Sequence, residues 1–204
     1  KVPDPVKGLQ ELARGYRKKW TGLVIGITGS VGKTTVKEMC ADVLSLQGET
    51  HRTAGNYNNQ IGLPLTMLAM PCEARHGVFE IGMNQPGEIA PLSRLTAPDV
   101  AIVTTVAPAH LAAFESIEGI AHEKASIYEG LSPGGIALAH ADVETAPILF
   151  EKAREVGAKL IRFGEAENAE MRLTEIRLSD TTTVIRAGMN GEERLLKLSV
   201  PGRH

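Results

Sequence analysis

The 204-residue sequence has few of the features that mark secreted, membrane-spanning or nucleic-acid-coating proteins. It contains only two cysteines, Cys40 and Cys72, which is too few for a disulfide framework and fits free thiols in a reducing cytoplasm. No apolar run reaches the roughly 18 residues that a membrane helix needs, so we expect no membrane insertion. A net charge of -2 argues against a basic surface that binds nucleic acid across the whole domain.

The sequence also lacks an initiator Met, a signal peptide, internal repeats and low-complexity segments. It starts at Lys1 and stops at His204 without a closing element, so we expect a truncated piece of a longer chain. Its 43% hydrophobic content suffices for the core of one domain. We predict a linker helix from an upstream domain over residues 1–20 and one domain over residues 21–204.

The most specific motif is a glycine-rich turn between a predicted apolar strand, Leu23 to Thr28, and a predicted helix. The turn reads Gly29, Ser30, Val31, Gly32, Lys33, Thr34 and Thr35. Small residues let backbone N–H groups converge on phosphate oxygens, the lysine adds a charge, and the first threonine hydroxyl suits Mg2+. The turn therefore predicts a nucleotide-phosphate loop, against the alternative of a tight strand-to-helix turn. One departure is Ile27, where the usual pattern Gly-x4-Gly-Lys-[Ser/Thr] has glycine.

Strand and helix signals alternate along most of the chain. Further strands are predicted at 77–81, 99–106, 135–141 and 159–163, and helices at 65–70, 86–95, 117–131 and 144–156. The helix after the glycine-rich turn is predicted from the spacing of Val36, Met39, Cys40, Val43 and Leu44. This alternation predicts an α/β fold with a mostly parallel sheet and helices on both faces. Short strands at 171–178, 182–187 and 194–200 predict a small antiparallel β appendage over 171–200.

Two polar side chains lie near the carboxyl ends of predicted strands, where open α/β sheets bind ligands. Glu80 interrupts an apolar strand, and beside a phosphate loop its natural partner is Mg2+; the alternative is a glutamate that reaches solvent from an edge strand. His110 follows the strand that ends near Thr105. From its position alone, His110 is either a ligand or a structural hydrogen-bonding residue.

Lys124 lies in the apolar stripe of a predicted helix. The stripe consists of Ile117, Ile120, Lys124, Ile127 and Leu131. Because burial of an ammonium group is costly, such a lysine extends to the rim, binds an anion, or loses its proton through a lowered pKa. A neutral amine is a nucleophile that could take up CO2 and become a carbamate, which is an acidic metal ligand.

Taken together, these segments resemble the central ATP-binding domain of the Mur ligases, cytoplasmic enzymes that add amino acids to the peptidoglycan precursor. The resemblance rests on residues 26–35, 55–66, 80–89, 109–111, 123–125 and 201–204. The phosphate loop, with isoleucine at 27, is shared with the folylpolyglutamate synthases. Residues 56–59 and 83–88 resemble the branch of the family that joins D-Ala-D-Ala to UDP-MurNAc-tripeptide through an acyl phosphate.

The resemblance implies a role for each matching residue. Lys33 would contact the ATP phosphates, Thr34 and Glu80 would bind one Mg2+, and His110 and a carbamylated Lys124 would surround a second Mg2+. Of these, Lys33, His110 and Lys124 are the expected catalytic residues. The family also takes contacts from upstream and downstream domains, so the piece alone is expected to be inactive.

The asparagine loop and two departures complete the comparison with the family. Asn58 and Asn59 match the loop that lies beside the phosphates and the acyl substrate. Thr105 and His140 stand where asparagines are common, so no adenine-contacting residue is assigned.

Other functions are weighed against the ligase. One is another Mur-type or folylpolyglutamate-synthase-like ligase, and a second is a nucleotide-binding module or scaffold without ligase activity. A GTPase-type switch is disfavoured, since the sequence contains neither Asn-Lys-x-Asp nor Asp-x-x-Gly after a strand.

Overall fold

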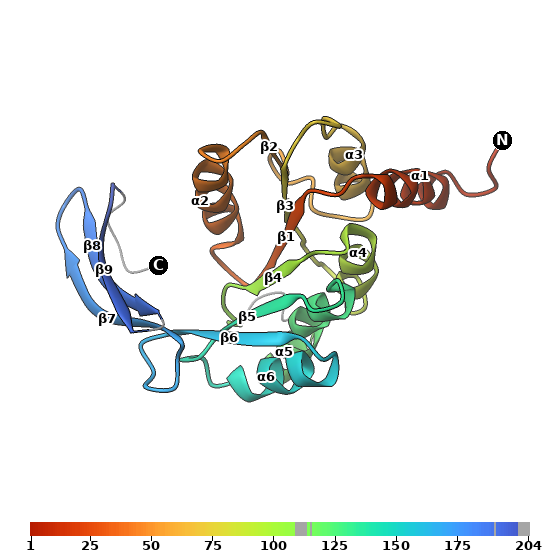
Figure 1. Cartoon of the computed structure of the whole chain (residues 1–204). Coiled ribbons are helices and arrows are strands. Elements are labelled where there is room, and N and C mark those ends of the chain that lie inside the picture. Colours follow the sequence, from red (N-terminus) through yellow and green to blue (C-terminus); the bar gives the residue numbers. More distant parts are fainter. Residues whose placement is uncertain (109–113, 115, 190, 200–204) are drawn as a thin grey trace.

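A computed structural model describes residues 1–108, 114, 116–189 and 191–199. Within these residues a nine-stranded sheet has the order β2-β3-β1-β4-β5-β6-β7-β8-β9 (Figure 1). The strands are β1 (Leu23–Thr28), β2 (Thr50–Arg52), β3 (His76–Glu80), β4 (Val100–Val103), β5 (Ile136–His140), β6 (Lys159–Gly164), β7 (Met171–Leu178), β8 (Thr183–Met189) and β9 (Glu192–Leu198). Pairing is parallel from β2 to β7 and antiparallel from β7 to β9.

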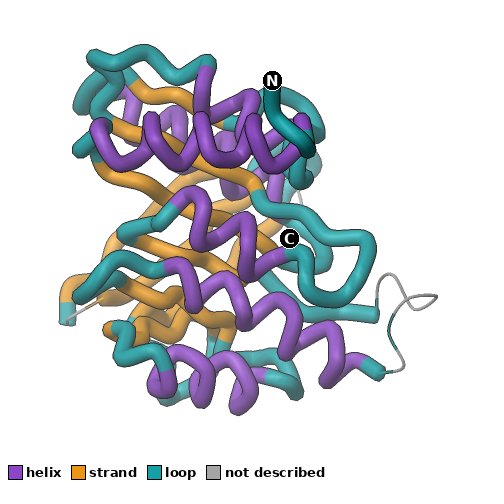
Figure 2. The backbone as a smooth tube through the Cα atoms, turned by 90° about the vertical axis from the view of Figure 1, so that its right-hand side faces the viewer, coloured by secondary structure: helices purple, strands orange, loops and turns teal. Residues whose placement is uncertain are grey.

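Helices cover both faces of the parallel strands, as predicted, but unequally. They are α1 (Pro5–Lys19), α2 (Lys33–Ser45), α3 (Gly62–Leu68), α4 (Ile89–Thr96), α5 (Ile117–Ala125), the 3-10 helix η1 (Ser126–Gly130) and α6 (Ala146–Glu155). Among the described helices, α2 alone packs on one face. The others form a layer on the opposite face, seen lying across the strands in Figure 2.

The predicted α/β fold with an antiparallel appendage is confirmed, and the differences are local. Strand β2 was not predicted from the sequence. The predicted helix over 117–131 divides into α5 and η1. The appendage continues the main sheet, because the start of β7 pairs with the end of β6 at Phe163 and Met171. In Figure 1 its three strands, drawn in blue, extend away from the helical layers.

Helix α1 packs on the rest of the domain. Ala13 is fully buried, and the Trp20 indole N–H donates to the Ala74 carbonyl at 2.9 Å. The Arg17 guanidinium donates to the carbonyl oxygens of Thr96 and Ala97, which end α4. These contacts fix α1 on this domain, and its role as a linker from an upstream domain stays a prediction.

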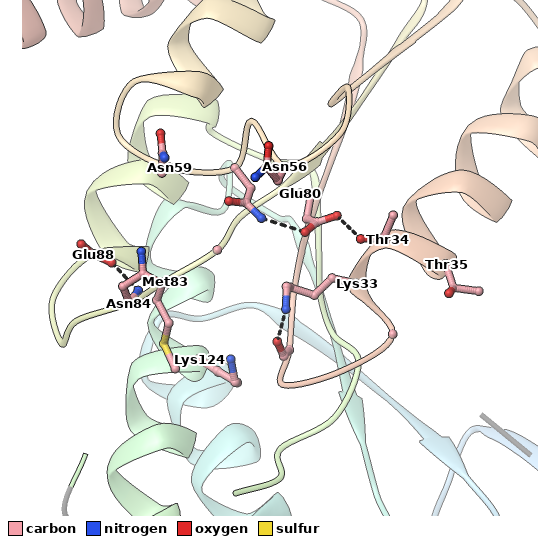
Figure 3. A pocket seen from close by; sticks show the side chains of 14 residues that line it. Lys33, Thr34, Thr35, Asn56, Asn59, Glu80, Met83, Asn84, Glu88 and Lys124 are labelled. Atoms are coloured by element: carbon pink, nitrogen blue, oxygen red, sulfur yellow. Dashed lines mark hydrogen bonds between the residues drawn. The ribbon is translucent and has the colours of Figure 1, made fainter. Parts of the chain in front are cut away.

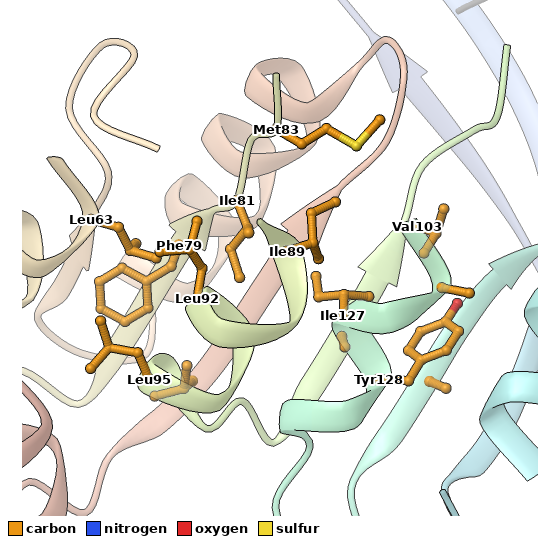
Figure 4. Close-up of a cluster of buried hydrophobic side chains, with 14 of the residues drawn as sticks. Leu63, Phe79, Ile81, Met83, Ile89, Leu92, Leu95, Val103, Ile127 and Tyr128 are labelled. Atoms are coloured by element: carbon orange, nitrogen blue, oxygen red, sulfur yellow. The ribbon is translucent and has the colours of Figure 1, made fainter. Parts of the chain in front are cut away.

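The larger apolar core lies between the sheet and the helical layer (Figure 4). It includes Phe79 of β3, Leu92 of α4 and Tyr128 of η1, all at most 3% exposed. The Tyr128 hydroxyl donates to the Leu138 carbonyl at 2.9 Å, which satisfies the polar end of a buried ring. Because η1 continues α5, this packing holds the end of α5 against the sheet.

The buried face of α2 differs from the predicted one. Val36, Cys40 and Leu44 pack against the sheet as expected. Met39 and Val43 are instead 39% and 60% exposed. The helix turns a different set of positions toward the strands, a point that matters for the further inference below.

Membrane insertion was examined over the described part of the chain. None of its helices combines the length and the apolar character needed to span a membrane.

Candidate functional site

The glycine-rich turn leaves β1 and enters α2 through a left-handed residue. Gly32 precedes the first residue of α2 with φ at 83°, a conformation that favours glycine. Ile27 is the penultimate residue of β1 and is fully buried against the α2 face of the sheet. The missing glycine is therefore a core position of a strand that extends to Thr28, and the turn itself begins at Gly29.

The turn is braced by the segment that follows β4. The Thr104 hydroxyl donates to the Val31 carbonyl at 2.6 Å. The Ser30 hydroxyl donates to the Ala107 carbonyl at 2.9 Å and accepts the Ala107 N–H at 3.0 Å. The Ser30 side chain is therefore engaged in holding the loop, which leaves backbone groups to meet a ligand.

Gly29 is the position where this bracing forbids a side chain. Its φ is 150°, and an added Cβ would collide with the Thr104 hydroxyl. We expect Gly29→Ala to lower the free energy of unfolding by about 1–3 kcal/mol and to misplace the loop. Chemical denaturation of the two proteins measures the loss.

The matched control is Gly134→Ala, at a residue that also has positive φ, at 77°, but open space around it. It should cost only the backbone term of about 1 kcal/mol. Equal losses in the two variants would show that the contact with Thr104 does not constrain the loop.

Glu80 is held at the carboxyl end of β3. It is 3% exposed, and β3 pairs with both β1 and β2, so the alternative of a solvent-reaching glutamate on an edge strand is wrong. One carboxylate oxygen accepts the Thr34 hydroxyl at 2.8 Å, and the other accepts the Asn58 amide at 2.8 Å. The first threonine of α2 and the strand glutamate thus meet directly, as the dashed lines in Figure 3 show.

The asparagine loop lies over the ends of β1 and β3. The Asn58 carbonyl accepts the Gly82 N–H at 2.9 Å, so the loop is tied to the segment after β3. The Asn59 side-chain oxygen accepts the N–H groups of Ile61 and Gly62 and caps the start of α3. Asn58 therefore orients Glu80, while the Asn59 oxygen supports the helix.

Lys124 is buried in α5, as its place in the apolar stripe predicts. It is 2% exposed and makes no hydrogen bond to another residue of the described chain. Burial lowers its pKa to about 7, and the nearby positive charge of Lys33 lowers it further. The neutral amine is consequently well populated near neutral pH.

Lys33, Thr34, Glu80 and Lys124 converge on one polar pocket of about 410 Å³ (Figure 3). Its lining consists of Gly29, Gly32, Lys33, Thr34, Thr35, Asn56, Asn58, Asn59, Glu80, Gly82, Met83, Asn84, Glu88 and Lys124. The Lys33 ammonium donates to the Gly29 carbonyl at 2.9 Å. The pocket therefore holds two lysines and a buried carboxylate at the carboxyl ends of parallel strands.

Several lining residues were not identified from the sequence, although they lie in the motif segments used there. Four of them belong to the loop after β3: Gly82, Met83, Asn84 and Glu88. Glu88 accepts the Asn84 N–H, and Glu123 of α5 accepts the N–H groups of Gly87 and Ile89 at 2.8 and 2.9 Å. This loop is thus fastened to the helix that carries Lys124.

Other predicted residues lie outside this lining. Ser30 and Val31 are not among the lining residues, so their contact with a cofactor stays a prediction. His110 falls among residues outside the described chain. His140 ends β5 and contacts the Phe163 ring edge-on at 5.1 Å, and it too is not part of the lining.

The pocket offers a partial rather than a complete metal site. No group of three or more His, Cys, Asp or Glu side chains suited to a metal occurs among the described residues. The Thr34 hydroxyl and Glu80 carboxylate are hard oxygen donors that fit Mg2+, which usually takes its other ligands from phosphates and water. The pair is therefore suited to a cation that arrives with a nucleotide.

This combination of a parallel sheet, a glycine-rich turn entering a helix, and a lysine beside a Thr–Glu pair defines a phosphate-loop α/β domain. The chain belongs to the Mur ligase family, because the family model for the Mur ligase middle domain matches residues 27–204.

Curated relatives match the whole chain. The UDP-N-acetylmuramoyl-tripeptide--D-alanyl-D-alanine ligases of Bacillus subtilis and Escherichia coli are each 38% identical to it, over 203 and 207 residues. The chain covers 43% and 45% of these two proteins, so it spans less than half of their length.

Solved structures agree with this assignment. The chain is similar to MurF from Acinetobacter baumannii, with a TM-score of 0.93, 31% identity and coverage of 98% of this chain and 44% of that one. It is also similar to MurF ligase from Thermotoga maritima in complex with ADP, with a TM-score of 0.87, 31% identity and coverage of 98% and 45%. Lactobacillus-type folylpolyglutamate synthase, printed as L. casei FPGS, shares the fold alone, at 15% identity, a TM-score of 0.72 and coverage of 99% and 60%.

Proposed function

We propose that this chain is the ATP-binding domain of a MurF-type ligase, which joins D-Ala-D-Ala to UDP-MurNAc-tripeptide. Relatives with that activity in their names match it over its full length. A structure that resembles it is a MurF complex with ADP. The observation that carries the proposal is the single pocket that brings Lys33, the Thr34–Glu80 pair and Lys124 together.

The proposed reaction proceeds in two steps. A carboxylate oxygen of the tripeptide attacks the γ-phosphorus of ATP, the bond to ADP breaks, and an acyl phosphate forms. The amine of D-Ala-D-Ala then attacks the acyl carbon, loses a proton, and expels phosphate to leave an amide. Both attacks on phosphorus and carbon require that anionic groups approach each other, so the domain must orient them and offset their repulsion.

The residues of the pocket divide this work. Lys33 and the N–H groups from Gly29 to Thr35 would hold the β- and γ-phosphates at the start of α2. Thr34 and Glu80 would hold one Mg2+, which supplies positive charge against the phosphate oxygens. Asn58 keeps the Glu80 carboxylate turned toward Thr34.

Lys124 has a second proposed role. With its pKa near 7, the neutral amine can attack the carbon of CO2, form a C–N bond and release a proton. The lysine would change from a cation into a carbamate anion, and with His110 it would provide oxygen and nitrogen ligands for a second Mg2+. Without that change, two ammonium groups would face the same pocket.

The remaining proposals concern the longer protein. Residues 1–20 would lead from an upstream domain that binds the UDP-sugar, and residues 21–204 would be the middle domain. A downstream domain would contribute part of the ATP and dipeptide contacts. The reaction would take place in the cytoplasm, and we expect neither nucleic acid nor a membrane as a partner.

The test is phosphate release by the full-length protein with each substrate omitted in turn. Phosphate should appear only when ATP, UDP-MurNAc-tripeptide and D-Ala-D-Ala are all present. Residues 1–204 alone should show no turnover. Turnover by this piece, or release that ignores the muramyl substrate, would contradict the proposal.

The same assay separates the alternatives. A folylpolyglutamate-synthase-like ligase would release phosphate with a folate and glutamate instead. A switch of the GTPase type would be stabilised by GTP rather than ATP in a thermal-shift comparison, and a scaffold would respond to neither nucleotide.

A further inference from the structure

Lys37 is a buried lysine that does not line the pocket. It lies on α2 one turn after Lys33 and is 1% exposed. Its neighbours on the sheet-facing side of α2 are Val36, Cys40, Ala41 and Leu44. A charge in such a place is costly, and apolar replacements of buried ion pairs are often neutral or stabilising. Packing alone therefore does not account for Lys37.

The Lys37 ammonium holds the end of β2. It donates to the Thr53 carbonyl at 2.8 Å and pairs with the Glu38 carboxylate at 2.9 Å. Glu38 also pairs with Arg52 at 3.1 Å, and Arg52 is the last residue of β2. Two successive residues, Arg52 and Thr53, are thereby fastened to α2.

Thr53 in turn fixes the backbone of Glu80. The last residue pair of the β2–β3 ladder is Arg52 with Val78. Beyond it, the Thr53 N–H donates to the Val78 carbonyl at 3.0 Å, and the Thr53 hydroxyl accepts the Glu80 N–H at 3.0 Å. The fully buried Thr53 side chain thus takes over where the strand pairing ends.

Thr53 is also the point from which the asparagine loop departs. Five residues later, the Asn58 amide donates to the Glu80 carboxylate at 2.8 Å. One residue therefore sets the backbone of Glu80 and the start of the loop that orients its side chain. A shift at Thr53 would reach the carboxylate by both routes.

We propose that Lys37 is a positioning residue for Mg2+ bound with nucleotide at Thr34 and Glu80. It acts through Thr53, which holds the Glu80 backbone and the start of the asparagine loop. This inference rests on the proposed function, because it presumes that nucleotide and Mg2+ bind in the pocket. Mg2+ demands near-octahedral geometry, so a small displacement of one carboxylate weakens its binding more than it weakens phosphate binding at Lys33.

The experiment compares ADP binding with and without Mg2+ in the full-length protein, by titration calorimetry. In Lys37→Met, metal-free ADP affinity should stay within about twofold, while the gain in affinity from Mg2+ should fall about tenfold, as for other residues that orient metal ligands. Thr53→Val should reproduce this loss, and Thr53→Ser, which keeps the hydroxyl, should restore the gain. Lys19→Met, at an exposed lysine of α1, is the control for loss of a charge.

The outcomes separate the inference from the function on which it rests. A parallel fall of both affinities, or an undiminished gain from Mg2+ in Lys37→Met, would show a purely structural lysine and overturn the inference. If Lys37→Met does not fold, the contrast between Thr53→Val and Thr53→Ser decides in the same way. A wild-type protein whose ADP affinity ignores Mg2+ would overturn the proposed function itself, and the inference with it.

Discussion

Replacement of Lys33 by alanine should reduce ATP-dependent phosphate release by the full-length protein roughly 100- to 1,000-fold, the range seen when one preorganised electrostatic group is removed. Lys33 is the first residue of α2, and its ammonium lies in the pocket on the Gly29 carbonyl. There it would neutralise phosphate charge as the γ-phosphoryl group is transferred. The measurement is kcat/KM for ATP under saturating muramyl substrate and dipeptide.

The control for Lys33→Ala is Lys159→Ala, at an exposed lysine of β6 on the same sheet. It removes the same charge from the protein and should leave kcat/KM within about twofold, since screened surface charges contribute little. Activity of Lys33→Ala near the wild-type level would refute the assignment of the glycine-rich turn as the phosphate site.

The second large effect is expected at Lys124. Lys124→Met in the full-length protein should lose about 100-fold in kcat, the upper range for changes around a metal site. Wild-type activity should rise with pH through about 7, because the neutral amine that forms the carbamate appears as pH passes its pKa. The residual activity of Lys124→Met should lack this rise. Carbon-13-labelled bicarbonate should give a carbamate resonance in the wild type that the variant does not show.

The lowered pKa of Lys124 also predicts how stability depends on pH in metal-free, CO2-free buffer. Between about pH 7 and the ordinary value of 10.5, the unfolded chain binds a proton at this lysine that the folded chain does not. The free energy of unfolding contributed by Lys124 should therefore increase with pH across this range, by at most about 1.4 kcal/mol per pH unit.

Residues 1–204 of the wild type and of Lys124→Met provide the comparison, with urea unfolding at several pH values. The methionine variant should be the more stable below pH 7, and the difference should shrink as pH rises. A difference that is independent of pH would contradict the lowered pKa, and Lys159→Met should behave like the wild type.

The sequence predicts the parts of this site whose signals are local. The glycine-rich turn stands between a recognisable strand and helix, and Lys124 is conspicuous because it interrupts an apolar stripe of fixed spacing. Both features lie where they were expected, and Lys124 is as deeply buried as its stripe implies. The α/β alternation likewise follows from local periodicity.

What the sequence did not predict depends on contacts between distant segments. Strand β2 is three residues long and includes no apolar residue, so only its pairing with β3 makes it a strand. The α2 face was assigned from Met39 and Val43, since apolar residues usually face the core. The true face includes Lys37, whose burial is explained only by Thr53. Convergence of the lining residues on one pocket also requires the folded chain.

The most direct test of the account is a crystal structure of the full-length protein with a non-hydrolysable ATP analogue and Mg2+. The β- and γ-phosphates should lie on the turn from Gly29 to Thr34 against Lys33, with Mg2+ bound by the Thr34 hydroxyl and the Glu80 carboxylate. A nucleotide bound elsewhere, or phosphates in the pocket with Mg2+ bound away from Thr34 and Glu80, would contradict the account.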